Sequence, residues 1–325
     1  LRYRPDSELF YLTGFTEPEA VLVLRGFADD ERTILFVRPR DEAAERWTGP
    51  RVGPARARSL VGVDNARPLA ALDEALPQLL QGADRVFSRL GRAAAVERGV
   101  VEALARSRTK GQREGKGPRG VVDPGEILDE LRLRKDPLEV QAIRESATLT
   151  VGAVREAIDG VAPGVGEWEI EAEVEAGFRR RGASGPAFPT IVASGPNACT
   201  LHYVENARRM EEGDLLLIDA GAERRMYPAD LTRTVPVSGR FSEEQADVYA
   251  VVERARARAV SATRPGATIE DVHRASLVAL VEGLVDLGVL DGDAEALIEE
   301  KAQEPYFPHR TSHWLGLDTH DVGDY

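Results

Sequence analysis

The 325-residue chain has 42 Lys and Arg side chains against 55 Asp and Glu, and its formal net charge at pH 7 is -13. Nucleic acids and anionic membranes attract basic surfaces, so this acidic balance argues against either of them as a partner. With 42% hydrophobic residues, the chain is long enough for two globular domains.

The amino-terminal part alternates between strand-like and helix-like patterns. Residues 20–24 and 33–37 are apolar or β-branched runs bounded by polar turns, which is typical of strands. Residues 69–80 and 93–105 instead have apolar side chains at helical spacing. This alternation predicts a small α/β domain.

A change of composition follows this part of the chain. Residues 109–120 (TKGQREGKGPRG) are rich in Gly and basic residues and have no periodicity, which indicates a surface loop. We therefore expect one domain over residues 1–122 and a second over residues 123–325.

The second domain begins with a strong helical pattern. Asp136 and Glu139 form a capping pattern, and apolar residues then recur at steps of three and four as far as Val161. A Pro-Gly pair and a second helix follow, and the order helix, Pro-Gly, helix begins again at Ser242. We interpret this as a weak internal duplication of a helix–strand unit, whose two halves would face a central cleft. The alternative is two unrelated hairpins.

No segment has the length of a membrane span. The most apolar one, residues 275–290, is interrupted by Glu282 and Asp286, and a spanning helix needs about 18 consecutive apolar residues. We predict no membrane partner.

Two aspartates adjoin predicted strands. Leu215–Ile218 is a branched apolar run that ends at Asp219, and eleven residues later Asp230 opens a second strand-like run, predicted to be antiparallel to the first. The carboxylates would converge, and such a pair repels unless a cation lies between them or one takes up a proton. A metal ion is the simplest answer. The alternative is that both are exposed turn residues, as Asp near Gly and Pro usually is.

Histidines gather near the carboxyl end. His309, His313 and His320 lie within twelve positions, although the chain has only five histidines. Pro308 and the absence of an intervening Glu argue against a helical zinc-protease motif.

A further candidate, His202, lies in a predicted loop after a strand-like stretch at residues 187–193. A lone histidine in a loop is usually solvated or structural. The same loop holds Cys199, the only cysteine, so no internal disulfide can form and a reducing compartment is expected, which we take to be the cytoplasm.

Together these segments resemble the aminopeptidase P and prolidase family of metallopeptidases, whose catalytic domain has the pita-bread fold. The matching motifs are Ile218-Asp219-Ala220-Gly221, YPADLTRT (residues 227–234), Leu201-His202-Tyr203, SHWLGLDTHDVG (residues 312–323) and, for the family's amino-terminal domain, YLTGF (residues 11–15). The resemblance implies an α/β (α+β) fold class, with a small amino-terminal α/β domain before a pita-bread domain.

The resemblance also implies two divalent metal ions that share and activate a water. Asp219 would be a terminal ligand, Asp230 would bridge the ions and His313 would bind one of them. Oxygen-rich ligation with one imidazole favours manganese. His202 and His320 would donate hydrogen bonds to the developing oxyanion, and His309 completes the predicted catalytic set.

The implied activity is removal of the amino-terminal residue from peptides with proline at position 2, by a homo-oligomer. The alternatives are a prolidase that cleaves only dipeptides, or a metal-free binding module of the same fold. Two glutamate ligands of the family would follow the histidine motif, beyond Tyr325. We therefore expect a chain shortened at both ends, whose incomplete ligand set leaves it largely inactive.

Overall fold

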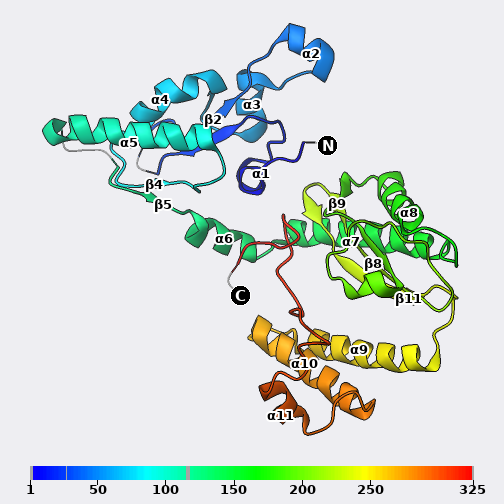
Figure 1. The fold of residues 1–325 in the computed structure, drawn as a ribbon. Coiled ribbons are helices and arrows are strands. Elements are labelled where there is room, and N and C mark those ends of the chain that lie inside the picture. Colours follow the sequence, from blue (N-terminus) through cyan, green and yellow to red (C-terminus); the bar gives the residue numbers. More distant parts are fainter. Residues whose placement is uncertain (1–2, 27, 115–117, 324–325) are drawn as a thin grey trace. The chain divides into compact units, whose positions relative to one another are not determined.

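The computed structural model describes residues 3–26, 28–114 and 118–323, and its chain divides into two compact units, Leu1–Arg134 and Lys135–Tyr325 (Figure 1). The boundary expected from sequence was 122/123, and the intervening helix α6 (Gly125–Leu133) groups with the first unit. None of the helices in the described ranges combines the length and apolar character needed to cross a bilayer.

The first unit is built on a three-stranded sheet of order β1-β2-β3. Strand β1 (Val21–Leu24) pairs antiparallel with β2 (Thr33–Val37), which pairs in parallel with β3 (Asn65–Pro68). The other elements of this unit, besides α6, are α1 (Ser7–Thr13), α2 (Glu42–Thr48), α3 (Gly53–Val61), η1 (Leu69–Ala71), α4 (Leu72–Leu79), β4 (Val86–Phe87), α5 (Ala94–Glu114) and β5 (Val121–Val122).

The central strand β2 organises the core of this unit. Ile34 and Phe36 are fully buried with side chains of α4 and α5. Leu35 and Val37 point to the opposite face and pack with Phe15 and α3. Since alternate residues of a strand face opposite sides, one apolar strand supplies both cores. The predicted α/β character of the unit is confirmed.

The loop expected at residues 109–120 is partly wrong, because α5 continues to Glu114. Lys, Gln, Arg and Glu are good helix formers, and a single internal glycine costs only about 1 kcal/mol, so a helix tolerates this composition. Residues 115–117 lie outside the described part of the chain.

The second unit contains two helical hairpins. The first consists of α7 (Pro137–Ile158) and α8 (Glu167–Arg180), and the second of α9 (Glu243–Ala262) and α10 (Ile269–Asp286). The capping box predicted at Asp136 is present, since its carboxylate accepts from the Glu139 N–H at 2.8 Å while Glu139 accepts from the Asp136 N–H at 2.9 Å. Capping boxes also begin α9 and α10.

Strands follow the first hairpin only, as far as the described residues reach. The strands are β6 (Gly185–Pro186), β7 (Ile191–Ser194), β8 (Leu215–Ala220), β9 (Ala222–Arg224), β10 (Tyr227–Pro228) and β11 (Leu231–Pro236), with η2 (Gly195–Cys199) after β7. They form antiparallel sheets of order β11-β8-β7 and β10-β9-β6. The second hairpin is followed by α11 (Ala294–Glu299) and an irregular segment, so within the described residues the helical hairpin recurs and the strands do not.

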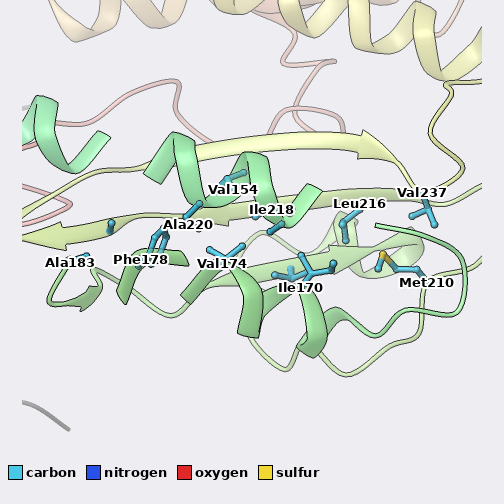
Figure 2. Packing of buried hydrophobic residues seen from close by; sticks show 14 residues of the cluster. Val154, Ile170, Val174, Phe178, Ala183, Met210, Leu216, Ile218, Ala220 and Val237 are labelled. Carbon is cyan, nitrogen blue, oxygen red and sulfur yellow. The ribbon is translucent and has the colours of Figure 1, made fainter. Parts of the chain in front are cut away.

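The side chains of strand β8 alternate between the core and the opposite face of the sheet. Leu216, Ile218 and Ala220 are fully buried and pack with side chains of α7 and α8, such as Val154 and Phe178 (Figure 2). The intervening residues of β8 are only half-buried. Asp219 therefore lies on the face that points away from this core.

A backbone contact fixes the end of β8. A Cβ atom built on Gly221 would lie 1.8 Å from the carbonyl oxygen of Ala229, the residue before Asp230. Only glycine allows the two segments to approach this closely.

We predict that Gly221→Ala destabilises the second unit by about 1–3 kcal/mol, because the methyl group forces the two backbones apart. Thermal unfolding monitored by circular dichroism measures the effect. Gly160→Ala is the control, since its Cβ would make only ordinary contacts at 3.4 Å or more. Equal stability of Gly221→Ala and the wild type would contradict the close approach.

Candidate metal centre

The antiparallel pair of β8 and β11 brings two carboxylates together. Asp219 is paired with Thr232, and Asp230 directly precedes β11, two residues before Thr232. Residues two apart in a strand share a face, so Asp219, Thr232 and Asp230 lie on the same side of the sheet. Thr232 and Asp230 both lie close enough to Asp219 to affect its carboxyl group.

The surroundings of the Asp219 carboxyl disfavour its negative charge. Burial raises its pKa, the negative charge of Asp230 raises it further, and the hydrogen bond from Thr232 opposes both. Its Oδ1 atom is buried and has no hydrogen-bond partner among the described residues. An orphaned carboxylate oxygen beside a second carboxylate is a favourable place for a cation.

His313 reaches the same pair from the carboxyl-terminal segment. Its Nε2 lies 3.2 Å from Oδ2 of Asp230, and its Nδ1 lies 2.9 Å from the carbonyl oxygen of Trp314. A carbonyl can only accept, so Nδ1 carries a proton and Nε2 is left to face Asp230. The hydrogen bond to Asp230 raises the pKa of His313. A ring oriented by a backbone carbonyl in this way is the usual arrangement of a metal-binding histidine.

The three predicted catalytic histidines surround these groups. His320 packs edge-to-face on His313 with ring centroids 4.4 Å apart, and partial burial followed by the charge of His313 lowers the pKa of His320. His202 and His309 form a second edge-to-face pair at 6.4 Å. The charge of His202 acts on both Asp219 and His320, so all six predicted residues belong to one electrostatic cluster.

The contacts between the predicted ligands are pairwise. Asp230 contacts Asp219 on one side and His313 on the other. Within residues 3–26, 28–114 and 118–323, no three His, Cys, Asp or Glu side chains come close enough together to form a complete metal-binding group.

An ion pair that sequence analysis missed supports the histidine segment. Lys135 Nζ lies 2.8 Å from Oδ2 of Asp321, and only 12% and 1% of the two side chains are exposed. The Asp321 N–H donates to the carbonyl of Trp314, so Asp321 closes a loop between His313 and His320. Because Lys135 and Asp321 are 186 positions apart, no local pattern could have revealed the pair.

Sequence comparison assigns the chain to a family. The model of metallopeptidase family M24 matches residues 141–325, and the model of the aminopeptidase P amino-terminal domain matches residues 1–87. The chain belongs to metallopeptidase family M24. Its pita-bread domain and the preceding amino-terminal domain are thus those of this family, which confirms the predicted fold class and family.

The M24 relatives match over nearly the whole chain. The Xaa-Pro aminopeptidase of Escherichia coli is 41% identical over 99% of this chain and 74% of its own length. The structure of Pseudomonas aeruginosa aminopeptidase PepP superposes with a TM-score of 0.96 at 41% identity, over 100% of this chain and 74% of that one. A zinc-substituted E. coli aminopeptidase P in complex with product has a TM-score of 0.94 at 40% identity, with the same coverage of both chains.

The residues present fit the divalent metal that an M24 metallopeptidase uses. Asp219 offers a buried oxygen without a hydrogen-bond partner, and Asp230 lies next to both Asp219 and His313. The Nδ1 of His313 is hydrogen-bonded to a backbone carbonyl, so Nε2 is the nitrogen that can bind a metal. These are the carboxylate and imidazole donors that borderline divalent ions prefer.

We predict that Lys135→Met lowers the free energy of unfolding by about 3 kcal/mol, because it leaves the buried Asp321 charge without its cation. Urea unfolding followed by tryptophan fluorescence measures the change. The control is Lys301→Met, which removes an ion pair to Glu304 whose side chains are 71% and 60% exposed and which should cost less than about 1 kcal/mol. A change as small as the control's would show that the Lys135 pair contributes little.

A second prediction concerns Asp219 in metal-free protein. A carboxyl whose folded pKa is raised holds its proton more tightly than in the unfolded chain, so this stabilisation is complete below the unfolded value of 3.8 and is lost as pH rises through the folded pKa. At neutral pH the ionised Asp219 therefore costs stability. Asp219→Asn should raise the Tm in the presence of a chelator at pH 7 by about 2–4 °C if the gain is about 1 kcal/mol.

The advantage of Asp219→Asn should shrink as the pH falls toward 4, and added manganese should stabilise the wild type more than the variant. Scanning calorimetry from pH 4 to 8 measures both effects. Asp247→Asn, at an exposed position of α9, is the control. A variant that is less stable than the wild type in chelator would contradict the inferred repulsion.

Proposed function

We propose that the chain is a metal-dependent aminopeptidase that releases the first residue of peptides with proline in second position. The observation that carries this proposal is the Asp219–Asp230 pair, with its orphaned buried oxygen and with His313 facing Asp230. The name of the E. coli relative, Xaa-Pro aminopeptidase, supports the choice of substrate.

Asp219, Asp230 and His313 would hold two divalent ions in this proposal, and Asp230 contacts both of the other two side chains. We favour manganese, since oxygen donors dominate the set. Such ions, when bound, lower the pKa of a water and polarise the scissile carbonyl.

The surrounding histidines would donate hydrogen bonds to the carbonyl oxygen of the substrate. Partial burial and the neighbouring His313 lower the pKa of His320, which favours the neutral imidazole with a single N–H donor. His202 and His309 lie on the exposed side of the cluster, where a peptide can approach. Donors aimed at a developing oxyanion stabilise the transition state more than the substrate.

Selectivity for proline follows from its chemistry. The bond before proline is a tertiary amide without an N–H, and the ring fixes φ, so a site shaped for the ring accepts what general peptidases handle poorly. A metal-free binding module is disfavoured, because a protein without metal has no reason to maintain Asp219 and Asp230 in mutual repulsion. We place the protein in the cytoplasm on account of its single cysteine, and the homo-oligomer stays a prediction.

Peptide cleavage tests the proposal with protein expressed from the full reading frame. We expect release of glycine from Gly-Pro-Ala in manganese and none in chelator. Asp230→Asn should lose more activity than the roughly 10–100-fold that follows loss of an outer partner of a metal ligand. Asp247→Asn, exposed on α9, should match the wild type.

The substrate range separates the remaining alternatives. Cleavage of Gly-Pro and not of Gly-Pro-Ala would identify a prolidase. Cleavage that persists undiminished in chelator, or in Asp230→Asn, would overturn the metal-dependent mechanism.

A further inference from the structure

A buried carboxylate outside the metal centre collects hydrogen bonds from the loop that carries His202. Glu167, the first residue of α8, is fully buried, and both of its oxygens are used. Its donors are the Ser194 N–H and hydroxyl at 2.7 Å each, the Asn197 side-chain amide at 3.2 Å, the Tyr203 hydroxyl at 2.9 Å and the Arg208 N–H at 2.8 Å. Every one of these donors lies in residues 194–208.

The charge of Glu167 is retained despite its burial. Burial alone would raise the pKa of this carboxyl, but the hydrogen bonds from Arg208, Ser194 and Tyr203 outweigh it and lower the pKa. Its place at the amino terminus of α8 also favours a negative charge. An ionised acid with several donors holds them more strongly than a neutral group would.

The same loop is fastened at two further points. The Tyr203 hydroxyl, while donating to Glu167, accepts from the N–H of Ala207 at 3.0 Å. The buried Asn206 side chain accepts from the Val192 N–H at 2.9 Å and donates to the carbonyl of Thr190 at 2.8 Å, which ties the loop to β7. His202 is the immediate neighbour of Tyr203, so its backbone position depends on this network.

We propose that Glu167 is the positioning residue for His202: its buried carboxylate folds residues 194–208 so that the imidazole lies beside the Asp219–Asp230 pair. This inference rests on the proposed function only in the role given to His202. The geometric claim stands independently of the activity.

Glu167→Gln tests the claim with an isosteric side chain. Its single carbonyl oxygen can serve one group of donors, while its amide NH2 faces the other group and repels it. The readout is the 1H–13C spectrum of the histidine rings, in which only five rings, each with two C–H signals, need to be assigned. We expect the His202 signal to shift or broaden while that of His273, on α10, is unchanged.

The kinetic expectation is a fall in kcat of about 10- to 100-fold with little change in KM, because a displaced donor is missed in the transition state. Tyr203→Phe removes one hydroxyl and should move the His202 signal in the same direction with a smaller loss of kcat. The control is Glu173→Gln on the same helix, where the carboxylate is 63% exposed and pairs with Arg180.

Each outcome decides a separate question. A His202 signal unmoved in Glu167→Gln overturns the positioning role, and if that variant does not fold, the same result in Tyr203→Phe overturns it. A shifted His202 signal in a protein that cleaves no Xaa-Pro peptide supports the positioning role and rejects the proposed function instead.

Discussion

Repulsion between two carboxylates is the constraint around which the second unit is built. The pairing of β8 with β11 holds Asp219 beside Asp230, although burial and like charge both disfavour ionised Asp219. The hydrogen bond from Thr232 compensates only part of this cost, and Oδ1 of Asp219 gains no partner among the described residues. The fold thus holds the two carboxylates in an arrangement that is energetically unfavourable without a cation and favourable with one. Metal sites couple ion binding to folding stability in this way.

The histidine-bearing segments are irregular, yet buried acids hold both of them. Glu167 gathers donors from residues 194–208, and Asp321 closes the turn after His313 while paired with Lys135. In each case a buried carboxylate lies against the loop. It accepts hydrogen bonds from backbone or side-chain donors that would otherwise be left to bond with water. These hydrogen bonds restrict the conformations of the loops and so help to position the imidazoles that the loops carry.

Local patterns predicted the regular elements well. The capping residues at Asp136 and Ser242 begin their helices as expected, and the apolar run before Asp219 is a strand paired antiparallel with the run after Asp230. Near neighbours in sequence determine these features, so the sequence displays them directly. The strand expected over residues 187–193 begins only at Ile191, because tertiary pairing sets such boundaries.

The buried residues that hold the loops of the site in place could not be predicted in the same way. Glu167 looks like an ordinary acidic residue in the first turn of a helix, and its donors lie 27 to 41 positions further along the chain. The surface loop predicted at residues 109–120 was partly wrong for the opposite reason, since the composition suggested a loop where good helix formers continue α5 to Glu114. Burial of a polar group depends on the whole fold, which no window of sequence contains.

The alternation along β8 has a consequence for how this protein can vary. Ile218 belongs to the core and Asp219 to the opposite face, so gain or loss of one residue inside the strand would exchange the two sets. A carboxylate would then point beneath α7 and α8, and Ile218 or Ala220 would take the position of Asp219. Insertions and deletions should therefore accumulate in the flanking turns, because a change of one residue inside β8 would reverse which side chains face the core.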